Sequence, residues 1–209
     1  MPIGPVIRRM FGPYERQISE AYRSIYIDID AFVDKMREWK PSASDILEVG
    51  CGEGAVTERL SRAYPDADIT AIDITPRLGR LYEGRREKVR FIECPVQDIA
   101  AREPGRFDLV VLGDVMHHVP ADLRQGVLEA VRATMAPGAT FVFKDWERTA
   151  TPIHWMCHAS DRWLTGDRVC FMKREEMRRR LASSFGEAAL AAEARLAPWR
   201  NNLATLVRT

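Results

Sequence analysis

The chain has no excess charge of either sign, and this absence excludes several kinds of partner. Its 209 residues carry 31 Lys and Arg against 30 Asp and Glu, a formal net charge of +1. A charge so close to zero creates no overall field that would attract nucleic acid or an anionic membrane. We therefore expect no nucleic-acid partner and predict that the chain acts on a small molecule.

Paired cysteines and long apolar runs are also missing. The four cysteines form no Cys-x-x-Cys pair, and we find no repeat, no secretory segment and no uninterrupted apolar span. These absences predict a reduced, soluble, cytoplasmic protein without a membrane span. We expect it to be a monomer or a homodimer. With 46% hydrophobic residues, the chain can bury the core of one α/β domain over residues 1–209.

What the sequence does contain is an alternation of strands and helices. This order is typical of an α/β fold, a doubly wound and mostly parallel sheet with helices on both faces. Only five residues separate the last two predicted strands, so these strands should form an antiparallel hairpin, because parallel neighbours need a longer crossover. We predict strands at residues 45–49, 69–73, 89–93, 109–112, 139–144, 188–196 and 202–208, and helices at residues 55–64, 76–84 and 121–135.

The most informative segment spans residues 45–54, where an apolar strand containing Glu48 leads into three alternating glycines. Gly50, Gly52 and Gly54 let the backbone approach a ligand, and the helix that follows offers unpaired N–H groups. The segment therefore predicts a cradle for a nucleotide cofactor. The same turn also satisfies the relaxed dinucleotide fingerprint, so a nicotinamide-dependent oxidoreductase is an alternative.

Glu48 separates these two alternatives. It lies two residues before the first glycine, and we expect its side chain to point into the mouth of the turn. A pyrophosphate at this place would be repelled by the carboxylate. S-adenosylmethionine instead has a cationic amine that would gain a charge-assisted hydrogen bond. Glu48 therefore favours S-adenosylmethionine over NAD.

With this motif, the chain resembles the class I S-adenosylmethionine-dependent methyltransferases of small molecules. Four segments carry the resemblance in family order: ILEVGCGEG at 46–54, ITAIDI at 69–74, FDLVVLGDVMHHVP at 107–120 and APGATFVF at 136–143. The resemblance implies a seven-stranded sheet that ends in an antiparallel strand pair. It also implies S-adenosyl-L-methionine as the cofactor and methyl transfer as the activity.

The resemblance assigns roles along the cofactor. Asp73 at the end of the second strand has two carboxylate oxygens that match two ribose hydroxyls, although it could instead serve the N-terminus of a helix at 76–84. Pro95 stands where relatives often carry Asp, so adenine recognition would pass to the residues after it. The predicted cofactor-binding residues are Glu48, Gly50, Cys51, Gly52, Asp73, Ile74, Val96, Gln97, Asp98, Gly113 and Asp114.

Three segments flank the cofactor-binding core, which we place at residues 41–147. Residues 1–40 form a helical arm that either packs on the sheet edge or acts as a lid, and residues 173–209 form a C-terminal helix and the strand pair. The arm is rich in large apolar and aromatic side chains: Met10, Phe11, Tyr14, Tyr22, Tyr26 and Phe32. If the arm is a lid, Tyr14 and Tyr22 are candidates for substrate binding.

The second flanking segment, residues 148–172, is predicted to contain a helix that begins at Pro152 and ends before Gly166. One face of this helix carries four polar side chains, His154, Cys157, His158 and Asp161. The face forms either a polar pocket wall, with Trp155 and His158 binding substrate, or a structural contact. Zinc is not expected, because the sequence shows no ligand pair on another element.

The sulfonium of the expected cofactor is already a reactive electrophile, so the protein mainly has to align an acceptor and exclude water. A hydroxyl acceptor also needs a base, and we name His117 first and His154 second, with Asp145 orienting a base or substrate. We predict O-, C- or N-methylation of a small aromatic or apolar acceptor. A non-catalytic protein that binds S-adenosylmethionine is a further alternative.

Overall fold

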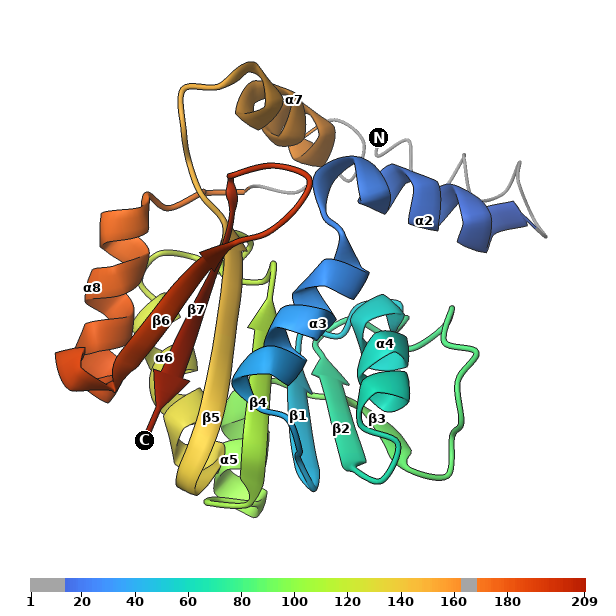
Figure 1. The fold of residues 1–209 in the computed structure, drawn as a ribbon, viewed down its shortest axis with the longest axis vertical. Helices are drawn as coiled ribbons and strands as arrows, with labels where there is room; N and C mark the ends of the chain where they lie inside the picture. The colour runs from blue at the N-terminus through green and yellow to red at the C-terminus, as the bar shows by residue number, and fades with distance from the viewer. Residues whose placement is uncertain (1–13, 163–168) are drawn as a thin grey trace.

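The structure of the chain, a computed structural model, describes residues 14–162 and 169–209 (Figure 1). Met10, Phe11 and Gly166, which were named above, lie outside the described residues. One seven-stranded sheet organises the described chain, in the order β3-β2-β1-β4-β5-β7-β6. Its strands are β1 (Asp45–Val49), β2 (Asp68–Asp73), β3 (Val89–Glu93), β4 (Phe107–Gly113), β5 (Met135–Trp146), β6 (Leu190–Arg195) and β7 (Asn202–Arg208).

The strand directions confirm the predicted α/β fold. Strands β1 to β5 pair in parallel, whereas β7 pairs antiparallel with both β5 and β6. The predicted C-terminal hairpin is therefore confirmed. Both faces of the central strands are covered, which explains why these strands are nearly continuous apolar runs in the sequence.

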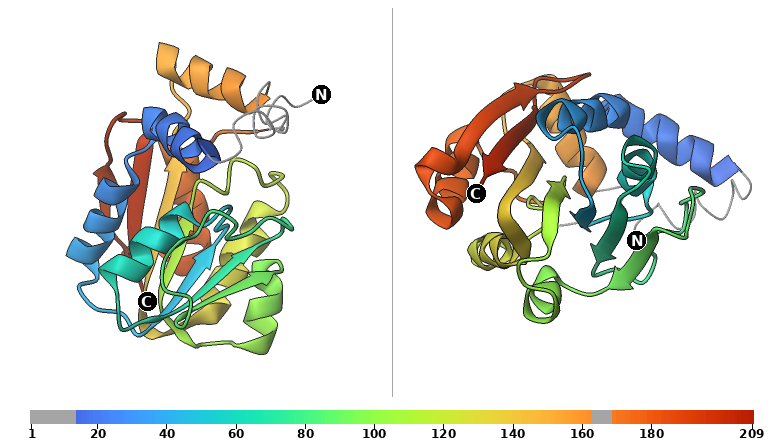
Figure 2. Two further views of the ribbon diagram at one scale, coloured as in Figure 1. Left: turned by 90° about the vertical axis from the view of Figure 1, so that its right-hand side faces the viewer. Right: turned by 60° about the horizontal axis from the view of Figure 1, so that its bottom comes forward.

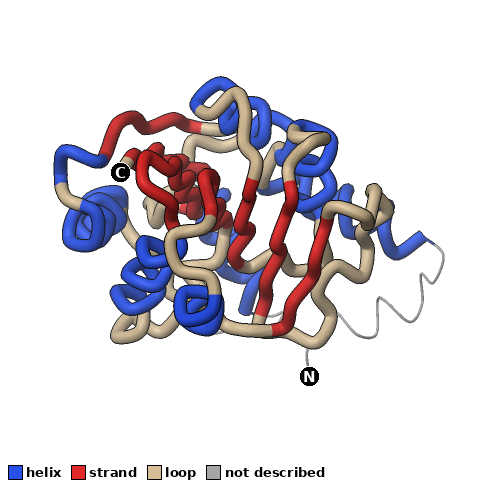
Figure 3. Tube along the Cα trace, turned by 90° about the horizontal axis from the view of Figure 1, so that it is seen from below, coloured by secondary structure: helices blue, strands red, loops and turns tan. Residues whose placement is uncertain are grey.

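Helices form a layer on each face of the sheet, as the tube view shows (Figure 3). On one face, α3 (Ile29–Trp39) and α4 (Ala55–Ala63) pack their apolar side chains against Ile46 of β1. The other face carries α5 (Val96–Arg102), α6 (Arg124–Thr134) and α8 (Arg174–Phe185), which is followed by the short η3 (Glu187–Ala189). Part of the predicted arm, α3, is thus a component of the core.

Two further helices lie beyond the carboxyl ends of the parallel strands. These are α2 (Glu15–Tyr26) and α7 (Pro152–Ser160), which lie above the sheet in Figure 1 and in the left view of Figure 2. As predicted, α7 begins at Pro152. Within the part of the chain that the structure describes, no helix combines the length and the apolar character needed to cross a membrane.

The predicted helix at 76–84 is wrong, because this segment consists of turns and irregular chain. Gly79 has a φ of 63° and lies so close to Phe91 that a Cβ there would be 2.6 Å from the ring. Such a positive φ interrupts a right-handed helix. The predicted helix at 121–135 is shorter than expected, since α6 ends at Thr134 and β5 begins at Met135.

Candidate active site

The glycine turn after β1 has the backbone geometry that its sequence predicts. Gly50 and Gly52 have φ values of 78° and 50°, a region that side chains disfavour. A Cβ at Gly50 would be 2.1 Å from Cγ2 of Val115, whereas a Cβ at Gly52 would meet no protein atom within 4 Å. The turn is thus packed against the protein at Gly50 and opens to free space at Gly52.

Asp73, at the end of β2, fixes this turn. Its Oδ2 accepts a hydrogen bond from the backbone N–H of Gly52 at 2.7 Å, and its Oδ1 accepts one from Thr75 at 3.0 Å. Each carboxylate oxygen has a second lone pair, so the group can still accept bonds from hydroxyls. Ile74 beside it is 75% exposed and presents an apolar surface to solvent.

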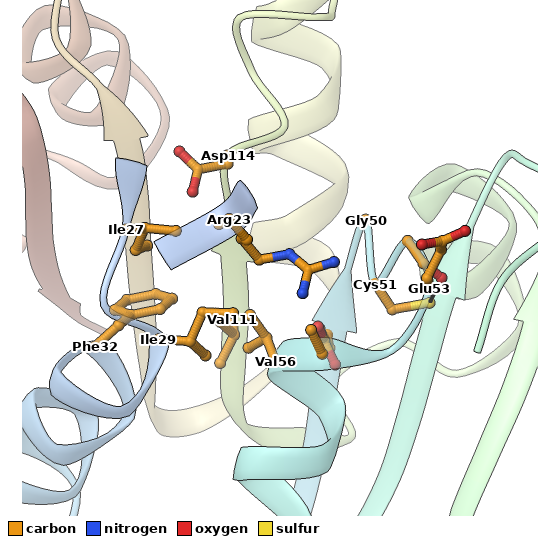
Figure 4. A pocket seen from close by; sticks show the side chains of 14 residues that line it. Arg23, Ile27, Ile29, Phe32, Gly50, Cys51, Glu53, Val56, Val111 and Asp114 are labelled. Atoms are coloured by element: carbon orange, nitrogen blue, oxygen red, sulfur yellow. Dashed lines mark hydrogen bonds between the residues drawn. The ribbon is translucent and has the colours of Figure 1, made fainter. Parts of the chain in front are cut away.

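A cavity of about 250 Å³ lies against the turn, between the ends of β1 and β4 and the N-terminal helices (Figure 4). The sheet and the glycine turn provide one wall of this cavity, and α2 and α3 with the link between them provide another. The lining residues are Arg23, Ile27, Ile29, Phe32, Glu48, Gly50, Cys51, Gly52, Glu53, Ala55, Val56, Val111, Gly113 and Asp114.

Glu48 is the main buried acid of this cavity. Its side chain is 3% exposed, and its Oε2 has no hydrogen-bond partner among the described residues. The hydroxyl of buried Thr57 lies beside this carboxyl and partly offsets the effect of burial on its pKa. Burial raises the pKa of Glu48 to about 7. An unsatisfied buried carboxyl oxygen is costly, and a cationic ligand group would satisfy it. The cavity therefore fits the ammonium of S-adenosylmethionine and disfavours a pyrophosphate.

Asp114 follows β4 at the rim of the cavity. It is the one non-glycine residue of the described chain with a positive φ, 56°. Its two carboxylate oxygens lie 2.6 Å and 2.5 Å from Nζ of Lys144, an ammonium that is almost fully buried on β5. This ion pair joins the ends of β4 and β5. Backbone strain of this kind tends to occur at functional sites.

His117 and Asp145 form a buried pair beside Asp114. Nδ1 of His117 lies 2.5 Å from Oδ1 of Asp145, and the imidazole stacks on Phe171 with ring centroids 4.8 Å apart. Burial alone would lower the pKa of His117, but the Asp145 carboxylate outweighs it and raises that pKa above its ordinary value. Although burial opposes the change, His117 lowers the pKa of Asp145. The pairing makes His117 a stronger base.

The ends of β4 and β5 thus bring three predicted site residues together. Ligand atoms of Asp114, His117 and Asp145 all lie within 4.8 Å of one another. Oδ2 of Asp145 is buried and has no hydrogen-bond partner among the described residues. Three such groups could hold a metal ion, but the Lys144 ammonium already pairs with Asp114 and supplies positive charge there.

The candidates on α7 and α2 occupy different surroundings. His154 is buried, accepts a hydrogen bond at Nδ1 from the Trp146 indole at 3.1 Å, and has its pKa lowered by burial and by His158. Trp155 is 66% exposed, and the half-buried His158 packs near Phe171. Of the predicted substrate-binding residues, Tyr14, Tyr22, Trp155 and His158, none lines the cavity beside the glycine turn.

The predicted adenine-binding residues form the first turn of α5. Val96 is 3% exposed and packs in the core, so only its backbone remains available to a ligand. Gln97 is exposed and Asp98 is half-buried. The segment lies at the carboxyl end of β3, on the cofactor side of the sheet, but outside the cavity described above.

Two functional candidates were missed by the sequence interpretation. Arg23 of α2 extends into the cavity, and Lys144 holds Asp114. Lys144 interrupts the apolar run of β5 near its carboxyl end, a signal that could have identified it. Arg23 has no comparable signal, because it is one of several charged residues on an amphipathic helix.

Comparison with known protein families decides the class of the protein. A family model described as a methyltransferase domain matches residues 47–141, which include the glycine turn, Asp73, Asp114 and His117. Residues 47–141 of the chain are thus similar to the methyltransferase domain family. Methyltransferases of this class use S-adenosylmethionine, so the cofactor prediction is confirmed at the level of the family.

Curated relatives of this methyltransferase domain include ubiquinone biosynthesis O-methyltransferases. The protein from Xanthomonas campestris is 34% identical over 108 residues, which are 50% of this chain and 44% of that protein. The protein from Bordetella parapertussis is 34% identical over 113 residues, 51% of this chain and 44% of its own. The matched region is thus less than half the length of these relatives.

Solved structures confirm the fold of the methyltransferase domain over nearly the whole chain. The Burkholderia thailandensis 1,6-didemethyltoxoflavin N1-methyltransferase, crystallised with its substrate and S-adenosylhomocysteine, has a TM-score of 0.67 at 18% identity, covering 98% of this chain and 88% of its own. The N-methyltransferase NodS from Bradyrhizobium japonicum, in complex with S-adenosylhomocysteine, has a TM-score of 0.62 at 20% identity, covering 94% and 88%. At these identities the likeness shows the fold alone.

Proposed function

We propose that the methyltransferase domain transfers the methyl group of S-adenosylmethionine to a hydroxyl of a small, aromatic or apolar acceptor. The observation that carries this proposal is the buried pair of His117 and Asp145, which does not line the cavity itself but lies next to Asp114 at its rim. A nitrogen or carbon acceptor need not lose a proton before transfer, whereas a hydroxyl gains from a positioned base. The O-methyltransferase relatives support the same choice.

The cofactor would be held by the residues that line the glycine turn. We propose that Glu48 binds the amine of the cofactor and that Asp73 binds its ribose. The protein backbone would approach the cofactor most closely at Gly52. When bound, the cofactor supplies an activated methyl group on a sulfonium. The cavity walls would exclude water, and Ile74 would cover an apolar edge of the adenine.

His117 would act as the general base. Its Nδ1–H would donate to Asp145, which would leave Nε2 with a lone pair that can take the proton of an acceptor hydroxyl. Asp145 would be a positioning residue that fixes this tautomer and stabilises the imidazolium. We assign the cluster with Asp114 to proton transfer and not to a metal, since Lys144 already neutralises Asp114.

The compartment is also part of this proposal. All four cysteines are free, and three of them are buried. Unpaired thiols are typical of proteins kept in a reducing environment. We therefore propose a cytoplasmic enzyme that acts on a small molecule.

Two measurements test the proposed function. Calorimetry should detect S-adenosylhomocysteine binding and no NADH binding; the opposite pattern would support the nicotinamide alternative and overturn the proposal. Methyl transfer from labelled S-adenosylmethionine to a panel of phenols and catechols should then be compared between the wild type and His117→Gln. We expect kcat to fall about 10²- to 10⁴-fold, as for the loss of a general base.

Matched variants distinguish chemistry from folding. Glu38→Gln changes an exposed side chain of α3 outside the site and should leave kcat within about twofold. Asp145→Asn should lower kcat and move the pH dependence of kcat/KM, because the raised pKa of His117 depends on that carboxylate. Cofactor binding without transfer to any phenol, or a His117→Gln enzyme with full kcat, would contradict O-methylation by this base.

A further inference from the structure

Arg124 is a buried cation at a place where burial and the helix dipole both disfavour positive charge. It is the first residue of α6, so the positive end of the helix dipole lies beside its side chain, which is 1% exposed. An ion pair with Glu176 of α8 offsets this only partly, because the two groups are 3.7 Å apart. An apolar side chain of similar size would fill the same space at a lower cost in free energy. The guanidinium of Arg124 therefore has a role other than packing.

This guanidinium joins two segments of the chain through their carbonyl groups. Its Nε donates a hydrogen bond to the carbonyl of Val119 at 2.9 Å, and its Nη2 donates one to the carbonyl of Cys170 at 2.6 Å. Val119 belongs to the loop that follows β4, whereas Cys170 lies in the segment before α8. Because a guanidinium presents its donors in a rigid planar fork, it holds the two carbonyls at a fixed separation.

The same two segments carry His117 and the aromatic ring that packs on it. The backbone N–H of Cys170 donates a hydrogen bond to the carbonyl of His117 at 2.8 Å. The next residue, Phe171, is buried and stacks on the His117 imidazole at an angle of 23° between the two rings. The contact with Asp145 fixes one edge of the imidazole, and the phenyl ring fixes its face. The orientation of His117 thus depends on how the two segments are held together.

We propose that Arg124 is a positioning residue for His117, because it holds the loop after β4 against the segment at 169–173 and so keeps Phe171 on the imidazole. The inference rests on the proposed function, since it takes His117 as the base. A base that is displaced from hydrogen-bond distance of its acceptor loses rate steeply. Arg124 itself does not line the cavity beside the glycine turn, so its loss should lower kcat and leave cofactor binding intact.

Kinetics of substituted enzymes test this role. Arg124→Met removes both carbonyl bonds and keeps a long apolar chain. We expect kcat for a phenol acceptor to fall about tenfold to a hundredfold, with S-adenosylhomocysteine affinity within about twofold of the wild type. Arg124→Lys can still donate to one carbonyl and should recover part of the lost kcat, because an ammonium lacks the planar fork.

Arg132→Met is the matched control for these variants. Arg132 is also an arginine of α6 that donates to a backbone carbonyl, that of Ser184 in α8, at 2.7 Å. Its bond involves neither the loop after β4 nor the segment at 169–173. The substitution therefore removes a bond of the same kind, and it should leave kcat within about twofold.

Nuclear magnetic resonance of the imidazoles tests the contact without any acceptor. The chain has four histidines, so the signals of His117 can be assigned by substituting the other three in turn. In the wild type, the ring current of Phe171 should displace the signals of the His117 ring protons upfield, and Phe171→Leu should abolish this displacement. Arg124→Met should reduce the same displacement, and Arg132→Met should not. The kcat losses of Arg124→Met and Phe171→Leu should be less than additive, because both act through one contact.

Several outcomes would overturn the positioning role. One is a normal kcat with an unchanged His117 signal in Arg124→Met, and another is an equal loss of kcat in Arg124→Met and Arg132→Met. If Arg124→Met fails to fold and binds no S-adenosylhomocysteine, Arg124→Lys and Phe171→Leu decide by the same two measurements. If the wild type methylates no phenol, the proposed function fails, and the His117 signals alone decide whether Arg124 positions the imidazole.

Discussion

The carboxyl edge of the sheet and the helix α2 face the same cavity but are stabilised by different means. At the sheet edge, Glu48, His117, Lys144 and Asp145 are all at most 6% exposed, and apolar clusters on both faces hold the strands that carry them. In α2 no residue is buried, and ion pairs provide much of the attachment. The groups that need exact placement are on the rigid side.

This difference has a direct energetic basis. Burying one large apolar side chain contributes about 1.5–3 kcal/mol, whereas an exposed ion pair contributes about 0–1 kcal/mol. The sheet edge can therefore hold strained or unsatisfied groups, such as Asp114 with its positive φ and the Oε2 of Glu48.

The largest expected effect is on the free energy of unfolding and comes from a substitution at Gly50, on the rigid side of the cavity. In Gly50→Ala, the new Cβ would lie 2.1 Å from Val115 Cγ2, and its φ of 78° is unfavourable for alanine. We expect a loss of about 2–5 kcal/mol in the free energy of unfolding, from strain plus overpacking. Urea denaturation followed by circular dichroism measures this loss.

Gly52→Ala is the matched control for that measurement. Its Cβ would meet no protein atom within 4 Å, so only the positive φ remains, and we expect a cost of about 1–2 kcal/mol. The same methyl group would occupy the open space beside the turn and weaken S-adenosylhomocysteine binding. Equal stability losses in the two variants would show that the packing at Gly50 is not as tight as described.

A smaller expected effect, the pH dependence of S-adenosylhomocysteine binding, tests the role of Glu48. Its pKa of about 7 lies above the ordinary value because of burial, so the carboxyl is mostly protonated below that pH. A cationic amine binds the ionised form, and S-adenosylhomocysteine affinity should therefore rise about tenfold from about pH 6 to about pH 8. Calorimetry at several pH values measures the rise. Glu48→Gln should bind more weakly and lose most of this dependence; an unchanged slope would assign the titration to another group.

The rigid side is also the part of the molecule that could be predicted from sequence. The glycine turn, Glu48 and the strands of the sheet follow from local patterns of apolar residues and glycine. His117 was predicted as the first candidate base and Asp145 as a residue that orients a base or substrate, and their contact follows because β4 and β5 are adjacent parallel strands whose carboxyl ends meet. A strand whose apolar side chains are buried on both faces has few alternative positions in the fold.

The parts that were missed depend on tertiary contacts. The turns at residues 76–84 replace a predicted helix because Gly79 packs against Phe91, a contact between distant segments. The helix α5, in which Val96 and Ile99 are buried, was not predicted. Arg23 resembles the other charged residues of α2 in the sequence, and only the placement of that helix over the cavity distinguishes it.

The smallest expected effect tests whether charge holds α2. Glu20→Gln removes the carboxylate that accepts two hydrogen bonds from Arg59, at 3.0 Å and 2.8 Å. Because a surface pair contributes about 0.2–1 kcal/mol, hydrogen exchange over α2 should become about 1.5- to 5-fold faster. Raising NaCl from about 0.05 M to about 0.5 M should speed exchange in the wild type and much less in the variant.

Glu38→Gln, which removes a pair within α3, should leave hydrogen exchange in α2 unchanged. If neither salt nor Glu20→Gln altered exchange in α2 while the sheet stayed protected, apolar contacts would have to hold the helix, and the contrast between the two sides of the cavity would be lost.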